Sequence, residues 1–184
     1  MYDSEEYDTF PRLLRFNAKR IKHLPAMREK NLGIWKTVTW EQQYKNALLI
    51  ANTLVSLGIK KSDKVAIIGD NRPHLYHSMA ATQSLGAIPV PCYQDSVAEE
   101  MSYIIEHAEA KIAIVENQEQ VDKLLEIFKD LSKLEYIIYD DPSGLEDYPE
   151  KFLINMNNIL SSEKDIDTSF IESSINLGIS SDVA

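Results

Sequence analysis

The stretch from residue 64 to residue 116 constrains the fold more than any other part of the chain. Three short apolar runs in it, 65–68, 87–90 and 112–115, alternate with two helical patterns. Each run has the length of a buried strand, and the helical patterns are long enough to cross a sheet. Alternating strands and helices predict a parallel sheet with packed crossover helices. We therefore expect an α/β fold with a parallel βαβ-type sheet flanked by helices.

Patterns on either side of this stretch extend the prediction. Residues 25–38 predict an N-terminal β-hairpin that turns at Asn31-Leu32-Gly33. The strand at 87–92 carries Pro89 and Pro91, which lack N–H donors, so we expect it near an edge of the sheet. Helices are expected at residues 9–22, 40–57, 73–85, 97–108 and 118–131, with a fourth parallel strand at 136–139.

Capping residues predict where three of these helices begin. Thr39 with Gln42, and Ser96 with Glu99, have the spacing of a capping box, in which two side chains satisfy each other's backbone N–H groups. Asn71 is expected to cap the helix that contains Pro73 in its first turn.

The chain is expected to divide into three parts. Residues 1–140 form the α/β subdomain, and residues 141–181 form an acidic, loop-rich connector. Short helices are predicted near 156–160 and 168–174 within that connector. Residues 182–184 look like the start of another, interrupted strand.

Composition excludes several classes of function. The net charge of −10 disfavours a nucleic-acid partner, because phosphate binding needs a basic face. The sequence has no polybasic membrane patch, and no apolar run reaches the roughly 20 residues of a transmembrane segment. Cys92 is the only cysteine, so no internal disulfide can form. These features predict a cytoplasmic protein and leave peripheral contact with a membrane open.

The usual signals of catalytic, cofactor or metal sites are missing. The six glycines lie at least eleven residues apart, so the chain has neither a dinucleotide-binding fingerprint nor a Walker-type loop. His74 and His77 share a helix face but have no third ligand in the pattern, and we interpret them as partly exposed helix residues. Cys92 has no evident base, and we interpret it as a small buried hydrophobe. No catalytic, cofactor-binding or metal residue is assigned.

Two loops at strand ends are the remaining candidates for a ligand site. Residues 70–73 follow the first parallel strand, and residues 93–95 follow the second. Ligands of open α/β sheets bind outside the carboxyl ends of strands. For 70–73, a simple helix start capped by Asn71 is the favoured alternative to a ligand-facing loop, and the same ambiguity holds for 93–95.

Several motifs resemble the adenylate-forming, or AMP-binding, enzyme superfamily. They occur in order over residues 9–140, and the chain looks most like the long-chain fatty acyl-CoA synthetases. The motifs are Thr39-Trp40 with Tyr44, Leu57-Gly58-Ile59 with Asp63-Lys64-Val65-Ala66-Ile67, Gly-Asp-Asn-Arg-Pro at 69–73, Ser-Leu-Gly-Ala-Ile-Pro-Val-Pro at 84–91, and Tyr103-Ile104 with Ala108-Glu109-Ala110-Lys111. Ser62 stands where the family pattern has glycine.

The resemblance implies a ligase that works in two steps. A fatty acid carboxylate attacks ATP to give an acyl-adenylate and pyrophosphate, and the thiol of coenzyme A then displaces AMP. Family members use Mg²⁺ to offset phosphate charge. The phosphate loop, the Mg²⁺-holding segment, the ribose-binding Asp and the mobile C-terminal lysine of the family have no counterpart here. The resemblance thus implies an incomplete N-terminal subdomain of an acyl-CoA synthetase-like fold, which we expect to bind no cofactor and to be inactive alone.

Two alternatives stay open. The chain could derive from another adenylate-forming acid–CoA ligase, or it could be a free-standing α/β binding or interaction module. A Thr-Ser-Gly-Thr-Thr-Gly-like loop encoded soon after residue 184 would favour an enzyme, and a stop codon there would favour the module. An interrupted domain leaves an unpaired sheet edge and uncovered apolar surface, so we also expect homo-oligomers.

Overall fold

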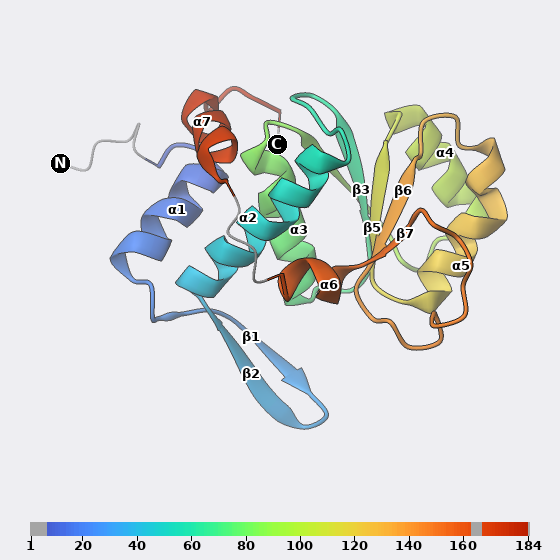
Figure 1. Cartoon of the computed structure of the whole chain (residues 1–184), viewed down its shortest axis with the longest axis horizontal. Coiled ribbons are helices and arrows are strands. Elements are labelled where there is room, and N and C mark those ends of the chain that lie inside the picture. The colour runs from blue at the N-terminus through green and yellow to red at the C-terminus, as the bar shows by residue number, and fades with distance from the viewer. Residues whose placement is uncertain (1–6, 163–166, 184) are drawn as a thin grey trace.

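The computed structural model describes residues 7–162 and 167–183, and it contains the predicted parallel sheet (Figure 1). Its five strands are adjacent in the order β4-β3-β5-β6-β7, and every neighbouring pair is parallel. The strands are β3 (Lys64–Ile68), β4 (Ile88–Cys92), β5 (Ile112–Val115), β6 (Tyr136–Tyr139) and β7 (Leu153–Asn155). The proline-bearing strand β4 lies at one edge, as its missing N–H donors predict.

Helices cover both faces of the sheet (Figure 1). They are α1 (Phe10–Arg20), α2 (Trp40–Ser56), α3 (Pro73–Ser84), α4 (Ala98–Ala108), α5 (Gln118–Ile127) with a 3₁₀ turn (Phe128–Asp130), α6 (Met156–Leu160) and α7 (Ser169–Leu177). Alternate residues of β3 separate the two layers: Val65 and Ile67 pack with α2, α3, α6 and α7, whereas Ala66 and Ile68 pack with α4 and α5. No helix within the described ranges is long and apolar enough to cross a membrane.

The predicted hairpin consists of β1 (Pro25–Asn31) and β2 (Ile34–Thr39), which pair antiparallel and project from the body (Figure 1). Thr39 ends β2 and begins α2 through the predicted capping box. Its hydroxyl accepts a hydrogen bond from the backbone N of Gln42 at 3.2 Å, and the Gln42 side chain accepts one from the backbone N of Thr39 at 2.9 Å. The box thus ties the end of the hairpin to the first turn of α2.

Two of the predicted helix caps are wrong. The residue that caps α3 is Arg72 rather than Asn71, and the residue that caps α4 is Val97 rather than Ser96. Neither of these caps accepts a backbone hydrogen bond through its side chain. Helix α3 begins with Pro73, which has no N–H, so one fewer donor needs a cap.

The segment 141–181 is more structured than the sequence pattern indicated. The two predicted short helices are present as α6 and α7, but strand β7 was not predicted. Four side chains of α6 and α7, those of Met156, Ile159, Ile171 and Ile175, are buried in the core. The segment therefore completes one face of the 1–140 sheet. Asp182 and Val183 form no strand here, and Ala184 lies outside the described residues.

Candidate functional site

The carboxyl ends of the parallel strands meet at one edge of the sheet, and the loops that follow them form the candidate site. The chain passes from β3 to β4 on one side and then crosses to β5 on the other side of β3. Open α/β sheets bind ligands at such a switch point. We call the loop 69–73 together with Glu116, the residue that follows β5, the switch-point site.

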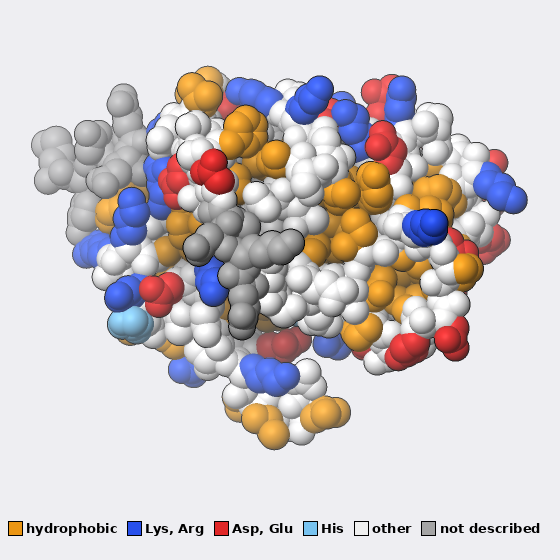
Figure 2. Space-filling view, viewed as in Figure 1, with side chains coloured by type: hydrophobic (Ala, Val, Ile, Leu, Met, Phe, Trp, Pro, Cys, Tyr) orange, Lys and Arg blue, Asp and Glu red, His pale blue; other side chains and the backbone are white. Residues whose placement is uncertain are grey.

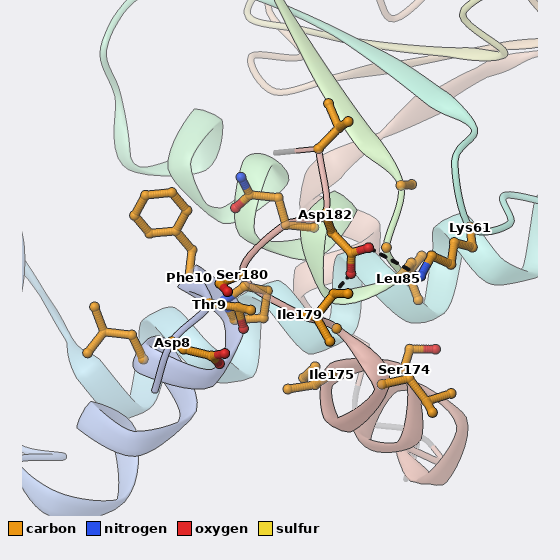
Figure 3. Close-up of a pocket in the computed structure, with 18 of the residues that line it drawn as sticks. Asp8, Thr9, Phe10, Lys61, Leu85, Ser174, Ile175, Ile179, Ser180 and Asp182 are labelled. Atoms are coloured by element: carbon orange, nitrogen blue, oxygen red, sulfur yellow. Dashed lines mark hydrogen bonds and ion pairs between the residues drawn. The ribbon is translucent and has the colours of Figure 1, made fainter. Parts of the chain in front are cut away.

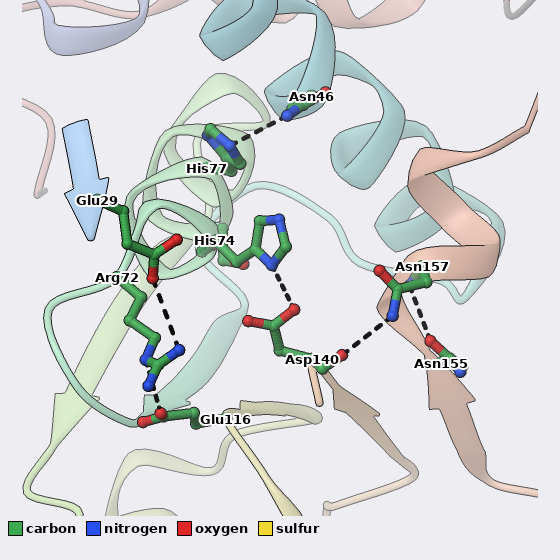
Figure 4. A network of polar contacts seen from close by, with 10 residues as sticks. Glu29, Asn46, Arg72, His74, His77, Glu116, Asp140, Asn155 and Asn157 are labelled. Carbon is green, nitrogen blue, oxygen red and sulfur yellow. Dashed lines mark hydrogen bonds and ion pairs between the residues drawn. The ribbon is translucent and has the colours of Figure 1, made fainter. Parts of the chain in front are cut away.

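An ion pair between two side chains of the chain, Arg72 and Glu116, lies within this site (Figure 4). Glu116 is only 7% exposed, and its Oε2 accepts a hydrogen bond from the backbone N of Asp70 at 2.7 Å. The other oxygen, Oε1, lies 2.9 Å from Nε of Arg72. A terminal nitrogen of Arg72 lies 3.6 Å from a carboxylate oxygen of Glu29 on β1. Arg72 therefore links the hairpin to the sheet at the switch point.

The close approach of the two loops requires glycine at position 69. Its φ of +155° is rare for residues with a side chain, and a Cβ built there would lie 2.7 Å from Cβ of Glu116. Any larger residue would have to displace Glu116 from its two partners. The Gly69-Asp70-Asn71-Arg72-Pro73 motif thus has a structural reason in the packing of this loop against β5.

The two candidate loops predicted from the sequence do come together. Nε2 of Gln94 donates to Oδ1 of Asp70 at 2.7 Å, which joins loop 93–95 to loop 69–73. The backbone oxygen of Gln94 accepts from Nζ of Lys123 on α5 at 2.7 Å. These contacts join the two loops and α5 at one rim of the sheet.

A polar hollow of about 680 Å³ lies between strand β1 and the switch-point loop. It is lined by Met27, Arg28, Glu29, Lys30, Asp70, Asn71, Arg72, Pro73 and Tyr76. Three cations and two acids line it, so its charge is nearly balanced. The hollow has room for a small polar ligand.

His74 connects the switch-point region to the next strand end. Its Nδ1 forms a short contact with Oδ1 of Asp140, the residue that follows β6 (Figure 4). The backbone oxygen of Asp140 accepts from the side-chain amide of Asn157 on α6 at 3.3 Å. His74 thus ties α3 to the ends of β6 and β7 through polar contacts.

His77 is buried, whereas we expected a partly exposed residue. Only 1% of its surface is exposed, and its Nε2 lies 3.0 Å from Nδ2 of Asn46 on α2. Its Nδ1 has no hydrogen-bond partner among the described residues. Burial, together with the nearby charge of His74, lowers the pKa of His77 to about 3. The imidazole is therefore neutral and acts as a core residue that joins α2 and α3.

Cys92 has no activating partner, and the described residues offer no metal centre. Cys92 is buried, its Sγ lies 3.5 Å from the backbone oxygen of Val90, and burial raises the pKa of its thiol to about 11. The thiolate that nucleophilic catalysis needs is thus disfavoured. Over residues 7–162 and 167–183, no group of three His, Cys, Asp or Glu side chains could hold a metal ion.

A second hollow lies at the opposite, amino edge of the sheet (Figure 3). It has a volume of about 420 Å³ and lies between α1, α7 and the residues that precede β3 and β4. Its lining is mostly apolar, with one ion pair in which Nζ of Lys61 lies 3.5 Å from Oδ1 of Asp182. Because it lies away from the carboxyl ends of the strands, it lacks the switch-point geometry.

Glu116 and Asp140 are the site residues that the sequence analysis missed. Each directly follows an apolar run that forms a parallel strand. That position is the same signal that drew attention to residues 70–73 and 93–95, and it could have identified both acids.

Comparison with known proteins places this architecture among enzymes. Residues 14–166 match the family model described as "AMP-binding enzyme". The chain is 32% identical over 121 residues to the long-chain-fatty-acid–CoA ligase ACSBG1 of Rattus norvegicus, a match that covers 65% of this chain and 17% of the rat protein. It is 34% identical over 117 residues to the mouse (Mus musculus) long-chain-fatty-acid–CoA ligase ACSBG2, covering 64% of this chain and 18% of that protein.

The fold also matches solved structures of ligases. The crystal structure of coronafacic acid ligase from Pectobacterium brasiliense superposes with a TM-score of 0.70 at 23% identity. The match covers 84% of this chain and 31% of that one. At this identity the likeness concerns the fold alone. The matched segment is thus less than a fifth of the length of the two mammalian relatives and about a third of the solved chain.

Proposed function

The chain belongs to the AMP-binding enzyme family, and on that premise we propose that it forms the N-terminal α/β part of a long-chain fatty acid–CoA ligase. The observation that carries the proposal is the identity above 30% to two relatives whose names specify long-chain fatty acids. The likeness to the coronafacic acid ligase supports the fold and leaves open a ligase for another acid. The lone, buried Cys92 supports a cytoplasmic location as part of the proposal.

The proposed overall reaction uses ATP, a fatty acid and coenzyme A. A carboxylate oxygen of the acid bonds to the α-phosphorus of ATP, and pyrophosphate leaves. The sulfur of coenzyme A then bonds to the acyl carbon, and AMP leaves with the electrons of the acyl–oxygen bond. Mg²⁺ would offset the charge of the phosphates.

We infer that the switch point of this chain does not hold the phosphates of ATP. A triphosphate needs clustered backbone N–H groups or several free cations. At the switch point, the backbone N of Asp70 and the guanidinium of Arg72 are already bound to Glu116, and a buried carboxylate there repels phosphate. We therefore assign no step of the reaction to any residue of this chain.

The role that we propose for the chain is structural. The sheet positions the loops 69–73 and 93–95 at one rim, and the contact between Gln94 and Asp70 holds them together. Such a rim would border a substrate cavity whose remaining walls come from another part of the protein. The isolated chain would then bind neither ATP nor coenzyme A.

Pyrophosphate exchange tests the proposed inactivity. The purified chain is incubated with ATP, Mg²⁺, palmitate and labelled pyrophosphate, and the incorporation of label into ATP is measured. We expect no incorporation above a blank without protein. Clear exchange would mean that the described residues hold a nucleotide site that their geometry does not suggest.

A chimaera tests the proposed family role. The corresponding segment of mouse ACSBG2 is replaced by this chain, and formation of acyl-CoA is measured with palmitate, acetate and benzoate. A folded chimaera that uses palmitate supports the proposal. A folded chimaera that uses none of the acids, while an unmodified ACSBG2 control is active, counts against it. A chimaera with Gly69→Val serves as the matched control, because the clash with Glu116 should disrupt the rim.

A further inference from the structure

The β-hairpin carries an unusual tip. Leu32 in the turn is 97% exposed, and Ile34 and Trp35 at the start of β2 are 69% and 65% exposed. Figure 1 shows the hairpin projecting from the body, and Figure 2 shows hydrophobic side chains gathered at its free end. Large apolar side chains at the end of a projection cost hydration free energy and stabilise nothing in the described fold.

The strand register sorts the hairpin into two faces. On one face, Lys30 is opposite Trp35 and Arg28 is opposite Thr37, and all four side chains are exposed. On the other face, Glu29 is opposite Lys36, and Glu29 is held by the ion pair with Arg72. One face is therefore anchored to the body and also carries Ile34 and Lys36. The other presents Trp35 beside Arg28 and Lys30, two cations that also line the polar hollow.

The charge of the hairpin is opposite to that of the chain. Residues 25–39 contain three cations and one acid, which give a net charge of +2, while the whole chain carries −10. The single acid, Glu29, is paired with Arg72. Because the body is acidic and the hairpin is basic, a negatively charged surface would attract the hairpin and repel the body. The molecule would therefore approach such a surface with the hairpin facing it.

We propose that this hairpin tip, Leu32, Ile34 and Trp35 with Arg28, Lys30 and Lys36 around it, docks on the surface of an anionic lipid bilayer. Tryptophan is favoured at the boundary between acyl chains and headgroups, and leucine and isoleucine favour the region just below it. Lysine and arginine at the level of the headgroups are attracted to anionic lipids. The three cations near this apolar tip would add electrostatic attraction to the burial of apolar area, the two contributions that set the strength of interfacial binding.

The shape of the hairpin favours a bilayer over a protein partner. The hairpin has only two strands, and its exposed large apolar side chains are confined to its free end. A bilayer accepts such a tip without a matching groove, whereas a protein partner or a second copy would need a complementary pocket. This inference is independent of the proposed ligase role, because it concerns binding that can be measured without substrate.

Vesicle sedimentation tests the proposal with the chain itself. Vesicles of phosphatidylcholine alone are compared with vesicles of phosphatidylcholine and phosphatidylserine in equal parts. We expect binding to the mixed vesicles, weaker binding to the neutral ones, and a loss of binding as salt is raised. Leu32→Ser combined with Trp35→Ser should lower the coefficient for partition of the chain onto the mixed vesicles by about tenfold or more. Lys30→Glu should weaken it by about tenfold on the anionic vesicles only.

A matched control uses Tyr103→Ser. Tyr103 is an exposed aromatic residue on α4, away from the hairpin, so its loss should leave vesicle binding unchanged. Circular dichroism verifies that each variant keeps its secondary structure. Tryptophan fluorescence gives a second readout, because the chain has two tryptophans and Trp40→Phe leaves Trp35 as the only reporter. We expect its emission to shift to shorter wavelength with anionic vesicles and to be quenched by brominated lipid.

Three outcomes would overturn the proposal. The first is a wild-type chain that stays in the supernatant with both kinds of vesicle. The second is binding that the hairpin variants retain, or that Tyr103→Ser weakens to the same extent. The third is a Trp35 emission shift that follows protein concentration without lipid, which would assign the tip to contacts between copies of the chain.

Discussion

Oε1 of Glu116 lies 2.9 Å from Nε of Arg72, across the point where the strand order of the sheet reverses. In doubly wound folds this crevice commonly receives a ligand. Here the carboxylate is buried, and its other oxygen accepts the backbone N–H of Asp70. The polar groups at the switch point therefore bind one another. For this reason we propose that the chemistry of the ligase takes place on residues outside this chain.

The first prediction concerns Glu116→Ala. The change leaves the backbone N of Asp70 without an acceptor and the guanidinium of Arg72 with only its longer contact to Glu29. We expect the free energy of unfolding in urea to fall by about 2 kcal/mol. Glu119→Ala is the control, because Glu119 is exposed and its ion pair with Lys123 should contribute no more than about 0.5 kcal/mol. Equal effects of the two variants would contradict a structural role for Glu116.

The second prediction concerns pH and His77. Its pKa is about 3 in the folded chain and about 6.5 when it is exposed on unfolding, so below pH 6.5 the unfolded chain binds one more proton. The stability that the neutral imidazole contributes is complete above pH 6.5 and is lost as the pH falls toward 3. We expect a loss of roughly 1.4 kcal/mol for each pH unit within that window.

Urea unfolding at about pH 7 and about pH 5 measures this loss. His77→Gln should flatten the difference between the two, whereas His107→Gln, at an exposed position of α4, should not. Carboxylates whose pKa is lowered in the folded chain titrate below this window. Hydrogen bonds from Ser143, for example, lower the pKa of Asp141 below its ordinary value, which places its titration at more acidic pH. A wild-type chain that is equally stable at both pH values would show that His77 is accessible to protons.

Hydrophobic periodicity and turn residues were sufficient to predict four of the five parallel strands, the flanking helices and the hairpin, but not strand β7. Each of these depends on residues close together in sequence, such as the capping box at Thr39 and Gln42. The interactions that join the elements around the site depend on residues far apart in sequence. The contact between Asn46 and His77 joins residues 31 positions apart, and the pair of Glu116 with the backbone of Asp70 joins residues 46 apart. No local pattern encodes such contacts, because they arise only when β3, β5, α2 and α3 are packed.

The third prediction concerns the segment beyond residue 140. Ile171 on α7 is buried in the same cluster as Ile50 and Leu54 of α2, and the sequence analysis assigned it to a connector. We expect Ile171→Ala to lower the free energy of unfolding by about 3 kcal/mol, because it removes buried volume from the core. Phe170→Ala, at the exposed neighbouring position, should cost less than about 1 kcal/mol. If Ile171→Ala hardly changes the free energy of unfolding, α7 would be a connector that does not stabilise the core.

The last prediction concerns self-association. The unpaired sheet edges are poor templates for it, because β4 carries Pro89 and Pro91 and β7 has only three residues. The surface at the amino ends of the strands is better suited to self-association. Phe10, Phe170 and Leu177 are exposed around its apolar hollow, and two copies that covered this surface would remove apolar area from water.

We therefore expect size-exclusion chromatography with light scattering to find oligomers that dissociate on dilution. Phe10→Ser combined with Leu177→Ser should shift the chain toward monomer, because these changes remove two of the most exposed apolar side chains of that surface. Tyr103→Ser, at an equally exposed position on α4, should leave the distribution unchanged. A wild-type chain that elutes as a monomer over the whole dilution series would contradict the prediction. Oligomers that persist in the double variant would instead assign the contact to another surface.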